Sequence, residues 1–190
     1  MKILALNGSH NNDGNTAYLL RKILGYFREE DTELINVYEA VSDAKWPFCI
    51  NCSTPCTKQC YKGTKLEELY KKVTDADFVI IGSPVYFGSM SAQLKAFFDK
   101  TRALRAEKAW LSKPMAAVSV GASKYGGQER TVEAIQSCAF VSGMTVIGNG
   151  SEFNMGHFGV SAQRPASEDE FANNQCESLA LAIKAQIKYE

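Results

Sequence analysis

Short apolar runs that alternate with helix-like stretches constrain this chain more than any other feature of its sequence. The clearest run is 76–82 (Ala-Asp-Phe-Val-Ile-Ile-Gly), whose consecutive apolar residues predict a strand buried on both faces. The same reasoning predicts further strands at 3–6, 33–38, 114–120 and 144–148, and helices at 17–27, 66–73, 92–104, 128–140 and 168–189. Because strands and helices alternate, we expect an α/β fold with a doubly wound parallel sheet and helices on both faces.

We expect a single domain, 1–190, because no linker or internal repeat divides the 190 residues. A hydrophobic content of 45% and a formal net charge of zero argue against a disordered segment and against a polyanion binder, so no nucleic-acid partner is expected. The apolar segment 3–6 is too short for the core of a signal peptide, and no run approaches membrane-spanning length. We therefore expect a cytoplasmic protein with no membrane partner.

The first predicted strand opens into a polar loop, 8–16 (Gly-Ser-His-Asn-Asn-Asp-Gly-Asn-Thr), that leads into the first predicted helix. The free N–H groups at a helix N-terminus attract anions, so this loop is a candidate phosphate site. It is not a Walker loop, since Asn15 stands where the lysine would be, and no G-x-G-x-x-G is present. A phosphate would be held by neutral donors and loop amides, and the candidate residues are Ser9, Asn11, Gly14, Asn15 and Thr16. The alternative is a capped turn between a strand and a helix.

Two more loops are expected at the same edge, because ligands of such sheets gather at the carboxyl ends of the strands. The loop 82–91 combines aromatic rings with exposed backbone, which a flat heteroaromatic ligand needs. Its candidate residues are Pro84, Val85, Tyr86, Phe87 and Gly88. The loop 121–128 is rich in glycine, which permits close approach of a ligand to the backbone. Its candidate residues are Gly121, Lys124 and Gly126. Either loop taken alone is also consistent with a simple connector.

Three motifs lie in these loops: Gly8-Ser9 with Gly14-Asn15-Thr16, the segment 82–88 leading to 94–99 (Leu-Lys-Ala-Phe-Phe-Asp), and Gly126-Gly127-Gln128. Together they resemble the flavodoxin-like NADPH-dependent FMN reductase family over nearly the whole chain. The resemblance implies a five-stranded sheet of order 2-1-3-4-5 and an FMN whose phosphate lies in the first loop. It also implies that Pro84 to Gly88 border the isoalloxazine and that the third loop approaches its pyrimidine end. One departure is Asn11, where the family often has a basic residue.

Four of the six cysteines lie in a cysteine-rich loop at about 45–62. They are Cys49, Cys52, Cys56 and Cys60. Four thiolates on one loop can wrap a compact metal centre. The segment is similar to that of the iron-sulfur flavoproteins, a branch of the same family with a four-iron (4Fe-4S) cluster beside FMN, although the spacing C-x2-C-x3-C-x3-C departs from that branch. Structural zinc and free or partly oxidised thiols stay open as alternatives. Cys138 and Cys176 lie on predicted helices, and we expect them to pack in the core.

The resemblance implies an enzyme in which hydride passes from NADH or NADPH to FMN and electrons then pass to a quinone, a flavin or an electron carrier. We expect the partners to be a small-molecule acceptor or a redox protein, and the assembly to be a homodimer or homotetramer. No side chain is expected to act as an acid or base. Two other classes stay open, a flavodoxin-like electron carrier and a cluster-containing redox sensor. The long irregular run 150–165 is expected to be functional or to contact a partner.

Overall fold

The computed structural model describes residues 1–152 and 155–189 and contains one parallel sheet in the order β2-β1-β3-β4-β5, with β6 also paired to β4. The strands are β1 (Ile3–Asn7), β2 (Thr32–Asn36), β3 (Phe78–Pro84), β4 (Pro114–Gly121), β5 (Thr145–Val146) and β6 (Val160–Gln163). This order is the one that the family resemblance implied, and it identifies a flavodoxin-like α/β fold.

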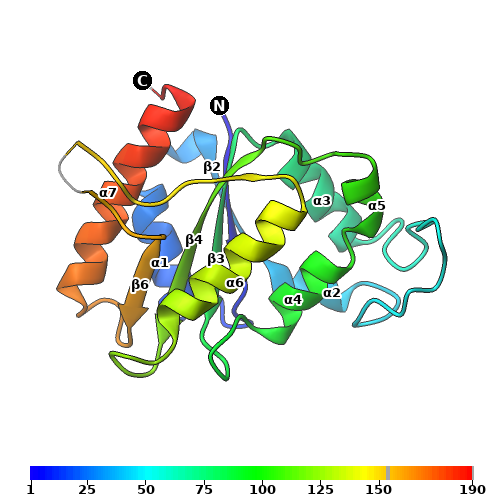
Figure 1. Ribbon diagram of the computed structural model, residues 1–190, viewed down its shortest axis with the longest axis horizontal. Coiled ribbons are helices and arrows are strands. Elements are labelled where there is room, and N and C mark those ends of the chain that lie inside the picture. Colours follow the sequence, from blue (N-terminus) through cyan, green and yellow to red (C-terminus); the bar gives the residue numbers. More distant parts are fainter. Residues whose placement is uncertain (153–154, 190) are drawn as a thin grey trace.

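Helices cover both faces of the sheet, as Figure 1 shows. One face carries α1 (Asn15–Leu24) and α7 (Glu170–Ile187), which pack on Ile3 and Ala5 of β1. The opposite face carries α2 (Val37–Ser42), α3 (Lys65–Asp75), α4 (Ala92–Asp99) and α6 (Gln128–Val141), which pack on Leu4 and Leu6. Successive side chains of a strand point to opposite faces, so a fully apolar strand supplies both cores. The remaining helices are η1 (Glu29–Asp31) and α5 (Arg102–Ala106).

The fifth position of the sheet differs from the prediction, because two short strands share it. Strand β5 pairs with the start of β4 at Pro114 and Met115, and β6 pairs with its end, from Val118 to Gly121. The predicted strand 144–148 is therefore shorter than expected, and the run 150–165, expected to be irregular, contains β6. Gly159 permits the chain to return to the sheet, since a Cβ there would lie 2.1 Å from the backbone oxygen of Ala117.

Two helix boundaries also differ from the prediction. The predicted strand 33–38 ends at Asn36, whose side chain accepts a hydrogen bond from the backbone N–H of Tyr38 and so caps α2. The predicted helix 92–104 is two helices, α4 and α5, separated by Lys100 and Thr101. The cysteine-rich loop follows α2 and contains no helix or strand over 45–62. Among the described residues, no helix has the length and apolar character needed to cross a membrane.

Candidate functional site

The first loop curls in front of the N-terminus of α1 through short hydrogen bonds of its own. Asn7 Oδ1 accepts from the backbone N–H of Ser9 at 3.0 Å, and Ser9 Oγ accepts from that of Asn11 at 3.2 Å. Asn11 Oδ1 then accepts from the N–H of Asp13 at 2.9 Å. The N-cap of α1 is Gly14, so no side chain caps the helix, and its first turn has no acidic residue. This end of α1 is therefore suited to an anion.

The last two candidates of this loop have different surroundings. Asn15 Oδ1 accepts a hydrogen bond of 2.8 Å from the backbone N–H of Ala166, so Asn15 fastens the loop to the segment before α7. Thr16 is buried, with its methyl group beside Gly82 of β3. The basic side chain nearest in sequence, Arg21, donates to the backbone oxygen of Asn12 at 2.8 Å. The side-chain oxygen of Asn15 therefore positions the loop, and the side-chain N–H groups of Asn15 are the ones that it offers to an anion.

The first and second loops are joined at Gly8. Its N–H donates to the backbone oxygen of Gly82 at 2.7 Å, and its oxygen accepts from Ser91 Oγ at 2.6 Å and from Gln93 Nε2 at 2.8 Å. A Cβ on Gly8 would lie 2.7 Å from the Gly82 oxygen, so the approach of the two backbones requires glycine. Gln93 is a site residue that sequence reasoning missed, because its partner lies 85 positions away.

The second loop ends in a tight turn that exposes its aromatic residues. Tyr86 and Ser89 exchange backbone hydrogen bonds of 2.9 and 3.1 Å, and the residues between them, Phe87 and Gly88, both have positive φ, 51° and 74°. Such a conformation is unusual for phenylalanine and marks a place where the backbone geometry is imposed. Phe87 is fully exposed and Tyr86 is 48% exposed. Together with Pro84 and Val85, this turn offers ring faces and backbone groups at the carboxyl edge of the sheet.

The third loop packs against the second. Gly127, the N-cap of α6, has φ of 94°, and a Cβ on it would lie 3.2 Å from the Cα of Gly88. Lys124 is exposed, with its Nζ 5.8 Å from the centre of the Tyr125 ring. Figure 1 shows the three loops together at the lower edge of the view. The predicted meeting of the three loops at one edge is therefore present in the structure.

The two other glycines of the third loop are buried (Gly121) and half-buried (Gly126), and both lie close to neighbouring protein atoms. A Cβ on Gly121 would lie 2.5 Å from Nε2 of Gln128, and one on Gly126 would lie 2.9 Å from the backbone oxygen of Ser123. The Gln128 amide closes the loop by donating to the oxygen of Ser123 at 2.6 Å. These glycines therefore shape the loop, and Lys124 is its exposed charged residue.

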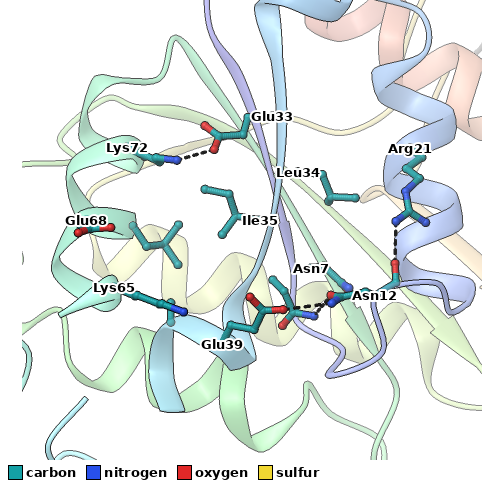
Figure 2. Close-up of a pocket in the computed structure, with 13 residues that line it drawn as sticks. Asn7, Asn12, Arg21, Glu33, Leu34, Ile35, Glu39, Lys65, Glu68 and Lys72 are labelled. Carbon is teal, nitrogen blue, oxygen red and sulfur yellow. Dashed lines mark hydrogen bonds and ion pairs between the residues drawn. The ribbon is translucent and has the colours of Figure 1, made fainter. Parts of the chain in front are cut away.

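Two hollows flank the loops. One, of about 570 Å³, lies along the free edge of β2 and reaches Asn7 at the end of β1 and Asn12 of the first loop (Figure 2). Acidic and basic side chains both line this hollow, and Figure 2 shows two of them, Lys72 and Glu33. The Nζ of Lys72 and the Oε1 of Glu33 form an ion pair at 2.5 Å. The other, of about 950 Å³, lies between the third loop and the start of α7, and Lys124 lines it. Each hollow adjoins one end of the candidate site, so neither is remote from the three loops.

The cysteine-rich loop projects from the α2, α4 and α5 side of the molecule (Figure 1). None of its four cysteines forms a disulfide. Cys49 and Cys56 are half-buried, Cys52 is exposed and Cys60 is buried. Within 1–152 and 155–189, no three Cys, His, Asp or Glu side chains are close enough together to hold a metal ion. The thiols nevertheless influence one another. Burial raises the pKa of Cys60, the charge of Lys100 opposes that rise, and Cys52 and Cys56 add to it.

The surroundings of these thiols fit a negatively charged metal centre. The hydroxyl of Tyr61 is buried and has no hydrogen-bond partner among the described residues. Such a group is costly unless a ligand accepts a hydrogen bond from it. Burial is the main reason that the pKa of Tyr61 is raised, and the charges of Cys56 and Cys60 raise it further. A hydrogen bond with Gln59 lowers the pKa of the Cys52 thiol, and Arg102 also lowers it. Four thiols are the ligands that an iron-sulfur cluster uses, and a hydroxyl donor and nearby cations are groups that can hydrogen-bond to such a cluster and balance its charge.

Comparison with known structures agrees with the fold. Solved structures that resemble this one include a flavodoxin-like WrbA-like protein from Agrobacterium tumefaciens, with a TM-score of 0.69, 16% identity and 97% of each chain covered. Another is a flavodoxin from the domain Archaea, with a TM-score of 0.64, 16% identity and 100% of each chain covered. These likenesses concern the fold.

The sequence comparisons identify the family. An iron-sulfur flavoprotein of Methanocaldococcus jannaschii is 37% identical over 99% of this chain and 98% of the relative, and one of Methanosarcina thermophila is 34% identical over 99% and 100%. The profile of the NADPH-dependent FMN reductases matches residues 1–158, which include all three loops and the cysteine-rich loop. The resemblance inferred from the motifs is confirmed: the chain belongs to the NADPH-dependent FMN reductase family.

Proposed function

We propose that this protein is an FMN-dependent oxidoreductase that accepts hydride from NADH or NADPH and passes electrons to a quinone, a flavin or a redox protein, and that Cys49, Cys52, Cys56 and Cys60 would hold an iron-sulfur cluster. The observation that carries the proposal is the direct joining of the three candidate loops, through Gly8 to Ser91 and Gln93 and through Gly127 to Gly88. Membership of the family supports FMN as the ligand, and the names of the relatives support the iron-sulfur centre.

The first loop is suited to the phosphate of FMN. We assign phosphate binding to the hydroxyls of Ser9 and Thr16, the amides of Asn11 and Asn15, and the uncapped N-terminus of α1 after Gly14. No lysine or arginine lies between Gly8 and Thr16, so neutral hydrogen bonds and the helix end must supply the attraction. Binding should therefore depend on hydrogen-bond geometry more than on net charge.

The other two loops are suited to the ring system. The backbone N–H groups of Val85 and Tyr86 donate to the oxygens of Val120 and Ser89. The N–H groups of Phe87 and Gly88 are therefore the ones that can face a flat heterocycle, and Tyr86 and Phe87 offer ring faces. The bound flavin would supply the hydride and electron chemistry. The protein needs no acid or base of its own, because backbone groups of Val85 to Gly88 can hydrogen-bond to the ring edge in either protonation state.

The cysteine-rich loop lies at the other end of α4 from the second loop. Helix α4 begins after Ser91, which contacts the first loop, and ends at Asp99, one residue before Lys100. Eight helical residues span about 12 Å, so the second loop and the cysteine-rich loop lie at opposite ends of a helix of about that length. A flavin held by the three loops and a cluster held by the four cysteines would therefore lie in the same chain, on either side of α4.

The test is anaerobic purification with iron supplied, followed by an absorbance spectrum, flavin, iron and sulfide analysis, and steady-state oxidation of NADH and NADPH with quinone or flavin as acceptor. We expect bound FMN, iron and sulfide, and turnover with at least one nicotinamide. Flavin without nicotinamide oxidation would favour an electron carrier instead. Iron and sulfide without flavin would contradict the assignment of the three loops.

A further inference from the structure

A buried lysine lies where the cysteine-rich loop meets the end of α4. Lys100 directly follows α4, and only 1% of it is exposed. Its Nζ donates a hydrogen bond of 3.4 Å to the backbone oxygen of Phe48, the residue before Cys49. Arg102 donates at 3.3 Å to the backbone oxygen of Ser53, the residue after the second cysteine. Lys100 after α4 and Arg102 at the start of α5 therefore hold both sides of the first cysteine pair with cationic side chains.

The charge of Lys100 has no carboxylate partner in the described part of the chain, where the lysines in ion pairs are Lys58, Lys72 and Lys95. An ammonium has three N–H donors, and a contact of 3.4 Å is at the weak end of the hydrogen-bond range. Burial of a cation with so little compensation is costly. Negative charge on the cysteine-rich loop would offset that cost.

We propose that Lys100 acts through the cysteine-rich loop to set the reduction potential of an iron-sulfur cluster held by its four thiolates. The inference rests on the proposed function, because it needs that cluster. Addition of one electron makes the four-thiolate centre more negative by one unit, so a fixed cation beside the loop stabilises the reduced form more than the oxidised form. Because Lys100 is buried, dissolved salt should screen its effect little.

Three variants separate the charge of Lys100 from its role as a hydrogen-bond donor. Lys100→Gln removes the charge and keeps a donor for the oxygen of Phe48. Lys100→Arg keeps the charge. Lys62→Met is the matched control, because Lys62 is an exposed lysine two residues after Cys60. Each holoprotein would be purified anaerobically, analysed for iron and sulfide, and titrated with reductant while the cluster is followed by electron paramagnetic resonance, at low and at high salt.

We expect Lys100→Gln to disfavour cluster reduction by about tenfold, which is about 59 mV for a one-electron couple. The shift should persist at high salt, and Lys100→Arg and Lys62→Met should stay close to the wild type. If Lys100→Gln loses the cluster, then Lys100→Arg decides: a retained cluster with wild-type potential supports the role of the charge, and loss in both variants overturns it.

An unchanged potential in Lys100→Gln, with iron and sulfide at wild-type levels, overturns this inference and leaves the proposed function intact. Absence of iron and sulfide from the wild type overturns the proposed cluster and the inference together. The iron content of the wild type therefore distinguishes the two failures.

Discussion

Gly8 is the residue through which the first two loops touch, so Gly8→Ala tests the candidate site directly. The new Cβ would lie 2.7 Å from the backbone oxygen of Gly82 and 3.0 Å from Cδ2 of Leu94. The Gly82 oxygen belongs to the backbone of β3 and cannot rotate away, so the carboxyl ends of β1 and β3 must move apart. That movement lengthens the 2.7 Å hydrogen bond from Gly8 N–H to the same oxygen.

The expected magnitude follows from two effects. Overpacking by one methyl group in a tight site costs about 1–3 kcal/mol. Weakening of one buried backbone hydrogen bond adds about 0.5–1.5 kcal/mol. We therefore expect the free energy of unfolding of the apoprotein to fall by about 2–4 kcal/mol. The hydrogen bonds from Ser91 and Gln93 to the Gly8 oxygen are also disturbed, so FMN affinity should fall by about tenfold or more, which is about 1.4 kcal/mol.

Urea denaturation of the apoprotein measures the first effect, and titration of FMN fluorescence quenching measures the second. Gly25→Ala is the matched control, because Gly25 has φ of −63° and a Cβ there would meet its nearest atoms at 3.4 Å. This variant should be neutral or more stable by about 0.4–1 kcal/mol, with unchanged FMN affinity. A Gly8→Ala protein that is destabilised yet binds FMN normally would refute the link between Gly8 and the ligand, and one with unchanged stability would refute the packing argument.

Four more predictions concern individual side chains. Ser9→Ala combined with Thr16→Ala should weaken FMN binding by about two decades or more, at about 1.5–3 kcal/mol for each lost hydrogen bond to a charged group, and should leave riboflavin binding nearly unchanged. Equal losses of the two ligands in parallel titrations would rule out a phosphate site. Cys52→Ser should lose iron and keep FMN, and wild-type iron content after anaerobic purification would contradict this. Lys124→Met should lower the two-electron midpoint potential of bound FMN, with a larger shift at low salt because Lys124 is exposed. An unchanged potential in spectroelectrochemical titration would make Lys124 a surface residue only. Burial raises the pKa of Cys176 from its ordinary value of 9.0 to about 12, so the folded thiol keeps a proton that the unfolded thiol loses. Stability should therefore fall as pH rises from about 9 toward 12, and Cys176→Ala should reduce that slope by up to about 1.4 kcal/mol per pH unit in reducing urea titrations. An identical dependence of stability on pH in both proteins would contradict the assignment of this effect to Cys176.

The strands of the sheet could be predicted where burial on both faces left an uninterrupted apolar run, as in 76–82 and 114–120. The prediction failed at β6, which has only two apolar residues in four and forms because β4 offers it a free edge. It also failed at α2, because Val37 and Tyr38 favour a strand by their residue types while the side chain of Asn36 starts a helix. In both cases the deciding interaction is not visible in local periodicity.

The three loops could be predicted because one rule, that ligands gather at the carboxyl ends of parallel strands, needs only the strand assignments. The contacts that join the loops could not, since Gln93 reaches Gly8 only after β1 and β3 have paired in register from Ile3 with Phe78 to Asn7 with Gly82. The sequence therefore located the loops but did not identify the hydrogen bonds that fix their relative positions.

Helix α4 connects the two candidate redox centres in a way that its sequence alone does not reveal. A lysine after a helix, as in 99–102 (Asp-Lys-Thr-Arg), is ordinarily a solvated C-terminal residue. Lys100 is nevertheless buried, and the cysteine-rich loop contacts it through the backbone oxygen of Phe48. At the opposite end of the same helix, Ser91 and Gln93 hold Gly8 of the first loop. A displacement of α4 would therefore change the surroundings of both centres at once, so variants at either end of this helix should be assayed for flavin and for iron together.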